Sequence, residues 1–393
     1  MRGIRLVGAV ALVAACTAFP VSPAWAEPGC PPAASTGQQI TGVPWPQARY
    51  DPGRLAGIVD GGGVTVAVVD SGVDDGYPQL AGAVLPGEDL LDRTGTGRRD
   101  CVGHGTAVAS IIAGAPLGGI LLGLAPGVRI LPFRVSEQEI VDGHPTGNPG
   151  TAAGVAKAVH DATDRGAQVI NLSLVLSTDH PEVRAAVGYA LAHDVVVVAA
   201  VGNGHRDGAQ DPTPYPAGYP GVLGVGAVDS TGVRLPTSAT GRYVDLVAPG
   251  AGVVAAARGH GLARYDGTSF AAPFVSATAA LIRQYHPGVS AVEVADRILA
   301  TTDPAPGGRH SDGYGYGILN PYRAVTEQPG VARSAAASPP SAQAPAGQAA
   351  APPDARAAAL AITLGGLLLA GLVGLSAIVL PRGAARRWRA GRT

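Results

Sequence analysis

Runs of fully apolar, β-branched residues recur through the middle of the chain and alternate with segments of helical character. A strand that is apolar at every position is typical of a sheet covered on both faces. The predicted strands cover Val64–Val69, Val128–Val135, Gln168–Leu174, Val195–Val201, Val222–Val228 and Val244–Val247. The predicted helices cover about 104–114, 151–165, 181–193, Ser269–Tyr285 and a stretch from near Ser290, where Ser290 and Glu293 have capping-box spacing. This alternation predicts an α/β fold with a doubly wound, mostly parallel sheet and helices on both faces, over residues 64–325.

The first 63 residues do not follow this pattern. Residues 1–26 have the layout of a secretory signal peptide, with two arginines, an apolar run and the small residues of Ala24-Trp25-Ala26 for cleavage. An alternative interpretation is a lipobox ending at Cys16, which would then carry a lipid. Residues 27–63 are rich in Pro and Gly and have no sustained period, so we expect an irregular N-terminal extension.

The C-terminal part of the chain has the composition of a tether followed by an anchor. Residues 326–356 are Ala, Pro, Ser and Gln with few large apolar side chains, which predicts a disordered linker. Residues 357–380 carry no charge, and at about 1.5 Å per residue they can cross a hydrocarbon core of roughly 30 Å as a transmembrane helix. Five arginines follow within residues 381–393, so the positive-inside rule predicts a cytoplasmic tail. A cell-wall sorting signal also ends in an apolar run followed by arginines, but it needs a sortase motif before that run, and residues 326–356 contain none. The sequence therefore predicts a single-pass protein of the cell membrane whose globular domain, residues 64–325, is extracytoplasmic.

Composition narrows the choice of function. The formal net charge is −1, which gives no indication of nucleic-acid binding. No H-E-x-x-H motif or clustered ligand set indicates a metal enzyme, and no motif implies a cofactor.

Three short segments carry side chains suited to nucleophilic chemistry. A buried strand ends at Asp70, where α/β sheets place their ligands, although such aspartates also cap helices or bind metals. His104 lies between two glycines and leads into a helix. Ser269 opens an apolar helix, whose free N–H groups favour developing negative charge, although an N-cap is the commoner role of a serine there. A serine hydroxyl becomes a useful nucleophile when a histidine takes its proton and an acid orients that histidine.

The segments that hold these residues are similar to the active-site signatures of the subtilases. They read Asp70-Ser71-Gly72-Val73, Gly103-His104-Gly105-Thr106 and Gly267-Thr268-Ser269-Phe270-Ala271-Ala272-Pro273, in the subtilisin order Asp, His, Ser. The resemblance extends over about residues 64–325. It implies a subtilisin-like fold and a serine endopeptidase whose catalytic triad is Asp70, His104 and Ser269.

The same resemblance implies further site residues. Ala199–Asn203 resembles the oxyanion-hole strand, in which Asn203 would donate its side-chain amide. The segment around Ser173, Leu174 and Val175 resembles the edge that pairs with extended polypeptide substrates by strand addition. Many subtilases have glycine where this chain has Val175, so we expect a narrow pocket and a preference for small P1 residues.

The cysteines predict one disulfide. If Cys16 leaves with the signal peptide, Cys30 and Cys101 remain outside the cytoplasm, where disulfides persist. A Cys30–Cys101 bridge would add roughly 4 kcal/mol of stability in the chain-entropy model and hold the extension near the catalytic face.

The overall organisation resembles one branch of the subtilases, the mycosins. The shared features are the signal peptide, the short cysteine-bearing extension, the sequence Asp100-Cys-x-Gly-His-Gly-Thr106, the Pro-rich tether and the C-terminal anchor. Mycosins accompany type VII secretion systems, so the resemblance implies cleavage of secreted proteins and association with the secretion membrane complex. The alternative is a protein that mainly stabilises that complex, with proteolysis secondary. Mycosins commonly carry a second cysteine pair in the catalytic domain, which this chain lacks.

Overall fold

The computed structural model describes residues 30, 37, 42–92, 94–116, 123–141, 144–208, 210–306, 308, 310–328, 380 and 382. The predicted signal peptide, the lipobox alternative at Cys16 and nearly all of the predicted linker, transmembrane helix and tail lie outside these residues. The chain divides into two units, Met1–Ala332 and Arg333–Thr393. Within the described ranges, no helix combines the length and the apolar character needed to cross a bilayer.

A seven-stranded parallel sheet forms the centre of the first unit, in the order β2-β3-β1-β6-β7-β8-β9. Its strands are β1 (Thr65–Asp70), β2 (Glu88–Asp89), β3 (Arg129–Arg134), β6 (Val169–Leu172), β7 (Val196–Ala200), β8 (Leu223–Val228) and β9 (Leu246–Pro249). β1 lies between β3 and β6, with Val66 opposite Ile130 on one side and Val169 on the other. The chain thus changes direction across the sheet beside β1, and such a switch point leaves a crevice at the carboxyl ends of the strands.

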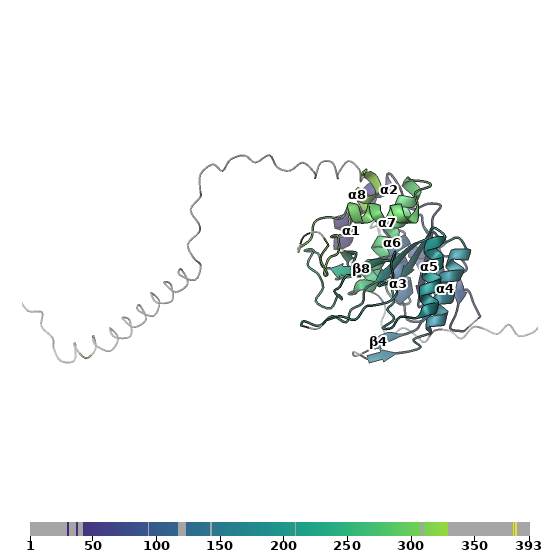
Figure 1. Ribbon diagram of the computed structural model, residues 1–393, viewed down its shortest axis with the longest axis horizontal. Helices are drawn as coiled ribbons and strands as arrows, with labels where there is room; N and C mark the ends of the chain where they lie inside the picture. Colours follow the sequence, from purple (N-terminus) through teal and green to yellow (C-terminus); the bar gives the residue numbers. More distant parts are fainter. Residues whose placement is uncertain are drawn as a thin grey trace, which may run out of the picture. The chain divides into compact units, whose positions relative to one another are not determined.

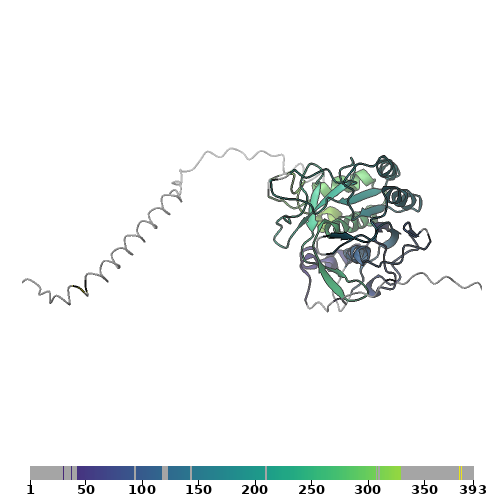
Figure 2. The same cartoon turned by 90° about the horizontal axis from the view of Figure 1, so that it is seen from below.

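Helices cover both faces of this sheet (Figures 1 and 2). α4 (Ala152–Asp164) and α5 (Pro181–Ala192) pack on one face, and α3 (His104–Ala113) and α6 (Thr268–Tyr285) pack on the other. α7 (Ala291–Ala300) and α8 (Pro321–Thr326) follow, and Ser290 and Glu293 make both hydrogen bonds of the predicted capping box. The predicted α/β fold with a mostly parallel sheet is confirmed, and each predicted central strand and helix is present within a few residues of its expected bounds.

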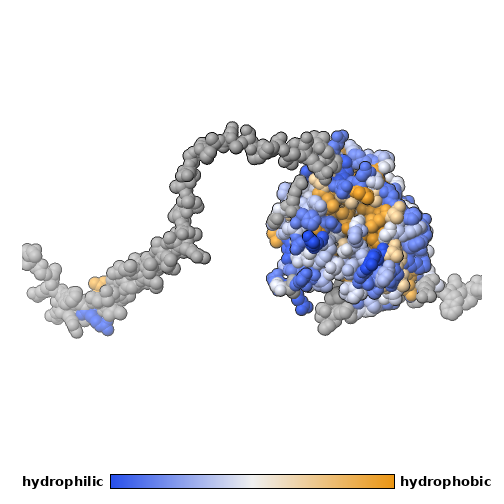
Figure 3. Space-filling view, viewed as in Figure 1, coloured by the Kyte–Doolittle hydropathy of each residue, from blue (hydrophilic) through white to orange (hydrophobic). Residues whose placement is uncertain are grey.

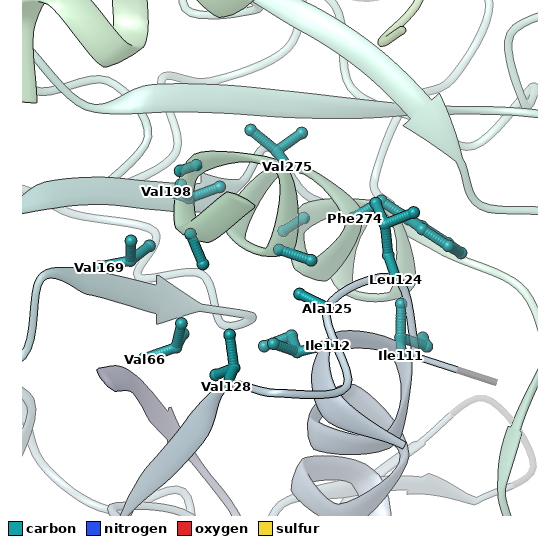
Figure 4. Packing of buried hydrophobic residues seen from close by; sticks show 14 of the residues in the cluster. Val66, Ile111, Ile112, Leu124, Ala125, Val128, Val169, Val198, Phe274 and Val275 are labelled. Atoms are coloured by element: carbon teal, nitrogen blue, oxygen red, sulfur yellow. The ribbon is translucent and has the colours of Figure 1, made fainter. Parts of the chain in front are cut away.

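Alternate residues of the strands supply the two halves of the core. Val66 and Val68 of β1 face the α3 and α6 side, whereas Ala67 and Val69 face the α4 and α5 side. Figure 4 shows the first of these layers, where Val66, Val169 and Val198 of the sheet lie close to side chains of α3 and α6. Full burial of a valine or phenylalanine side chain is worth about 1.5–3 kcal/mol, so this double-sided packing holds the strand ends of the site in place.

The described part of the N-terminal extension contains two short helices, which corrects the expectation that residues 27–63 are irregular. α1 (Trp45–Tyr50) and α2 (Pro52–Ala56) each have a proline in the first turn. The Tyr50 ring meets Phe274 of α6 edge-on at 5.6 Å between centroids, and Leu55 is fully buried. Helices this short are marginal in isolation, so packing against α6, which the local sequence does not reveal, stabilises them.

Several smaller elements, including the short β2 and α8, were also not predicted. β10 (Val253–Ala256) and β11 (Leu262–Tyr265) form an antiparallel pair, as do β4 (Glu139–Val141) and β5 (His144–Thr146). A 3₁₀ helix, η1 (Pro78–Leu80), follows β1. The face of the unit shown in Figure 3 is largely polar, with apolar surface over the region of α7, where Val292 is 71% exposed.

Candidate active site

Asp70 and His104 meet where β1 ends and α3 begins. The Asp70 side chain is buried, and its Oδ1 atom lies 2.7 Å from Nδ1 of His104. The same oxygen accepts a hydrogen bond of 2.7 Å from the backbone N–H of Ser71. A carboxylate that engages Nδ1 fixes the tautomer and leaves Nε2 of the imidazole as the acceptor.

Gly105 permits this close approach of strand end and helix start. A Cβ atom on Gly105 would lie 2.1 Å from the carbonyl oxygen of Gly72 and 3.1 Å from Cβ of Asp70. Any side chain at this position would push α3 away from β1.

Ser269 lies in the first turn of α6 and lines the same cleft as Asp70 and His104, a cleft of about 570 Å³. Phe270, the next residue, packs against the His104 ring at 5.1 Å between centroids and stacks on Tyr265 at 4.6 Å. No hydrogen bond joins Ser269 to His104 in the described part of the chain. Such catalytic contacts are often long in the absence of substrate and tighten when it binds.

Asn203 is oriented by Thr268, the residue before the candidate nucleophile. The Thr268 backbone N–H donates to Oδ1 of Asn203 at 2.9 Å, and the Thr268 hydroxyl accepts from the N–H of Gly202 at 3.0 Å. Because the amide oxygen is engaged, the Nδ2 group of Asn203 is left to donate. A Cβ on Gly267 would lie 3.0 Å from that nitrogen, and the φ angle of Gly267 is 139°, so glycine is required for both space and conformation.

A second hollow of about 350 Å³ adjoins the cleft, and Ser269 and Asn203 line both. Val175 is 43% exposed, and one of its methyl groups would be 3.4 Å from a Cβ on Gly202. The Val175 side chain therefore lies against Gly202 in the wall of this hollow, which we call the P1 pocket after its proposed role.

Backbone hydrogen bonds hold the walls of the P1 pocket. Leu176 and Tyr215 exchange two, of 2.7 and 3.0 Å, and the N–H of Ala239 donates to the carbonyl oxygen of Gly202 at 2.9 Å. The segment 173–175 between β6 and Leu176 lines both the cleft and the pocket.

The Ser173 side chain connects this segment to the start of α6. Its hydroxyl donates to the carbonyl oxygen of Ser269 at 2.8 Å and accepts from Nδ2 of the buried Asn171 at 2.9 Å. The hydroxyl of Ser276, about two turns further along α6, donates to Oδ1 of Asn171 at 2.8 Å. Ser173 thus helps to fix the position of Ser269 from the sheet side.

The electrostatics of the site act on the pKa of the His104 imidazole. Burial of the ring lowers the pKa of His104, but the charge and hydrogen bond of Asp70, together with the charge of Asp100, outweigh it. The pKa of His104 is therefore raised above its ordinary value of 6.5. Within the described ranges, no group of three or more His, Cys, Asp or Glu side chains could hold a metal ion.

The predicted disulfide between Cys30 and Cys101 is present, with the two Cα atoms 5.0 Å apart and a sequence separation of 71 residues. Two further contacts attach the extension to the β10–β11 region. The N–H of Gly37 donates to the carbonyl oxygen of His260 at 2.9 Å, and Nε1 of Trp45 donates to that of Ala251 at 2.7 Å.

The structure brings the residues predicted from sequence into one cleft, which is lined by Asp70, His104, Ser269, Asn203 and the segment 173–175. The sequence alone predicted no role for Thr268, Asn171 or Asp100, whose hydrogen bonds orient the residues of the cleft. Thr268 and Asp100 stand inside motifs that were recognised, four positions or fewer from a predicted site residue, and this proximity was the available signal.

A strand-end aspartate bonded to a histidine, with a serine at a helix start in the same cleft, is the side-chain set of serine hydrolases that act through an activated hydroxyl. The chain belongs to the subtilase family, which its sequence matches over residues 61–317. It is a subtilisin-like serine endopeptidase, and the mycosins are among the proteins it is similar to.

Individual relatives agree with this assignment. Mycosin-1 of Mycobacterium tuberculosis (strain ATCC 25618 / H37Rv) is 34% identical over 330 residues, which cover 72% of this chain and 73% of the relative. The thermophilic serine proteinase of Bacillus sp. (strain AK1) is 37% identical over 266 residues, 67% of this chain and 62% of the relative. The solved structure of the MycP3 protease from the type VII (ESX-3) secretion system superimposes with a TM-score of 0.63 at 31% identity, covering 77% of this chain and 98% of that one.

Proposed function

We propose that this protein is a membrane-anchored, extracytoplasmic serine endopeptidase that cleaves secreted proteins as part of a type VII secretion system. The observation that carries the proposal is the Asp70–His104 hydrogen bond of 2.7 Å beside Ser269 in one cleft, in a chain similar to the mycosins. The remaining details rest on the contacts within that cleft and on the sequence outside the described residues.

In the proposed reaction, Nε2 of His104 takes the proton of the Ser269 hydroxyl as its oxygen attacks the scissile carbonyl carbon. Asp70 holds the ring and stabilises the imidazolium that forms. His104 then gives the proton to the leaving amine, which leaves an acyl-enzyme at Ser269. Water, activated by the same histidine, attacks the ester and releases the second product.

The oxyanion of the tetrahedral intermediate would be stabilised by the side-chain amide of Asn203. The hydrogen bond from Thr268 to Oδ1 supports this role, because it sets the rotation of the amide before substrate arrives. Donors fixed in advance stabilise developing charge without a cost of reorganisation at the moment of reaction. The first turn of α6, which begins at Thr268, adds free N–H groups on the same side.

Substrate would bind as an extended strand beside Ser173, Leu174 and Val175. The side chain at P1 would enter the P1 pocket, where Val175 faces Gly202. We propose that this branched side chain limits the pocket to small P1 residues. Profiling with a peptide library tests the idea, and a clear preference for large aromatic P1 residues would end it.

The setting of the enzyme follows from segments outside the described residues. The apolar run 357–380 and the arginines after it would anchor the chain with its catalytic unit outside the membrane. The partners would then be extended polypeptides leaving the cell and the type VII secretion membrane complex. Carbonate extraction of membranes tests the anchor, since deletion of residues 357–393 should move the protein to the soluble fraction.

The decisive test of activity is labelling with a fluorophosphonate probe, which reacts with activated serines. The full-length wild type should label, Ser269→Ala should not, and Ser230→Ala, which changes an exposed serine on a turn, should label like the wild type. An unlabelled wild type would contradict the proposed mechanism.

The alternative, a protein that mainly stabilises the secretion complex, predicts a different result in cells. Secretion that survives Ser269→Ala but fails when the whole chain is deleted would favour the structural role. Loss of substrate cleavage and secretion in both strains would favour the peptidase.

A further inference from the structure

Asp100 is a buried carboxylate four residues before His104, and nothing in the proposed reaction uses it. The residue is 8% exposed and lies on the loop that leads into α3. Both of its carboxylate oxygens accept hydrogen bonds, five in total. A buried carboxylate with this many donors is a strong local constraint, because each charge-assisted bond is about twice as strong as a neutral one.

Four of these bonds fix the start of α3. Oδ1 of Asp100 accepts from the N–H groups of Val102 at 3.1 Å and Gly103 at 2.7 Å. Oδ2 accepts from the N–H of Thr106 at 2.8 Å and from its hydroxyl at 2.7 Å. Gly103 is the N-cap of α3 and has no side chain to satisfy these N–H groups, so Asp100 caps the helix from outside.

The fifth bond attaches this arrangement to the strand that carries Asp70. The hydroxyl of Ser71 donates to Oδ1 of Asp100 at 2.9 Å and accepts from the N–H of Gly105 at 2.9 Å. Ser71 directly follows Asp70, and its own N–H donates to the Asp70 carboxylate. One continuous network therefore runs from Asp70 through Ser71 and Asp100 to the first turn of α3, on both sides of His104.

The charge of Asp100 also acts on the imidazole, in the same direction as that of Asp70, and contributes to the raised pKa of His104. The other titratable groups that line the cleft with His104 are Tyr265 and Asp266, and Arg258 lies against Gly103. A second buried carboxylate beside an Asp–His pair would favour the imidazolium that forms during the reaction.

We propose that Asp100 is a positioning residue for His104, which aligns the imidazole with Asp70 by capping α3 and whose negative charge favours the imidazolium of the transition state. The inference rests on the proposed role of His104 as the general base. Asp100 would make two contributions, alignment through hydrogen bonds and stabilisation through charge. Asp100→Asn removes the charge, whereas Ser71→Ala weakens only the hydrogen bonds.

The test is the rate of fluorophosphonate labelling of Ser269 in the full-length protein as a function of pH. Asp100→Asn removes the charge and disturbs the bonds to Thr106. We expect the labelling rate to fall about 10- to 100-fold and its acid limb to move to lower pH. Ser71→Ala removes two hydrogen bonds, the one to Asp100 and the one from Gly105, and keeps the charge of Asp100. The labelling rate should therefore fall less and the acid limb should stay in place.

Asp89→Asn is the matched control. Asp89 is equally buried, at 4% exposed, and its carboxylate also accepts backbone hydrogen bonds, from Leu91 and Asp92, but it pairs with Arg134 and lies outside the cleft. Its replacement should leave the acid limb unchanged. A folded Asp100→Asn enzyme with the wild-type rate and the wild-type acid limb overturns the inference.

If Asp100→Asn does not fold, Ser71→Ala decides, because a wild-type labelling rate in that variant overturns the alignment role. Failure of the proposed function gives a different pattern. In that case the wild type itself remains unlabelled, whereas failure of this inference leaves the wild type and the Asp100 variant labelled alike.

Discussion

Replacing Cys30 and Cys101 by serine should destabilise the catalytic unit by an amount that the closed loop determines. The disulfide joins positions 71 residues apart. In the chain-entropy model the bond restricts the unfolded chain, and a loop of this length corresponds to roughly 4 kcal/mol at 25 °C. The folded state loses little else, because Gly37 and Trp45 keep their own hydrogen bonds to the β10–β11 region.

Urea unfolding of the purified full-length chain measures this difference. The double variant should unfold at a lower urea concentration, and reducing agent should shift the wild type to the same midpoint while leaving the double variant unchanged. The rate of fluorophosphonate labelling in native buffer should stay close to that of the wild type. A loss of less than about 1 kcal/mol would refute the loop argument, and an intact stability with lost labelling would assign the bond to the active site instead.

Three further predictions concern the site. Asn203→Ala should lower kcat by about 10²–10³ with little change in KM, because it removes a donor used in the transition state, and a loss below threefold would exclude that role. Val175→Gly should raise kcat/KM for a phenylalanine P1 substrate relative to an alanine one by about tenfold or more, and an unchanged ratio would contradict the narrow pocket. The acid limb of kcat/KM should have its midpoint above 6.5, because His104 must be neutral to act as a base and Asp70 raises its pKa. Stability should depend on pH in the opposite direction from activity. The protonated His104 stabilises the fold below pH 6.5, and this contribution is lost as the pH rises through the raised pKa.

The sheet and its covering helices could be predicted because their signal is local. β7 and β8 are buried at every position, so the apolar runs identify them without knowledge of their neighbours. The sequence signal of α6 is equally local, because Gly267 and Ser269 mark its start and apolar residues follow along most of its length.

The helices α1 and α2 lacked such a signal. Their sequences are short and rich in proline, and contacts such as Tyr50 on Phe274, more than two hundred residues away in sequence, stabilise them. The antiparallel pair β10–β11 is similar, since β11 has only four residues and no regular alternation of buried and exposed positions. Distant packing of this kind cannot be inferred from local periodicity.

The same division applies to the site. The aspartate, histidine and serine could be located because glycine-framed motifs surround them, but the residues that orient them could not. Thr268 accepts a hydrogen bond from the backbone N–H of the distant Gly202, and Asp100 accepts one from the hydroxyl of the distant Ser71 besides those of its own loop. The same residue types serve as ordinary caps throughout proteins, so neither role could be read from the sequence.

The main-chain hydrogen bonds beside the P1 pocket affect how its selectivity can change during evolution. Leu176 and Tyr215, and likewise Gly202 and Ala239, are joined through main-chain atoms, and a substitution of side chains leaves those bonds in place. The framework of the pocket is thus largely independent of the residues that project into it. If Val175 sets the P1 preference as proposed, a single exchange there gives the enzyme a new set of cleavage sites while its fold and its reaction chemistry stay the same, and descendants of this chain could acquire different targets one mutation at a time.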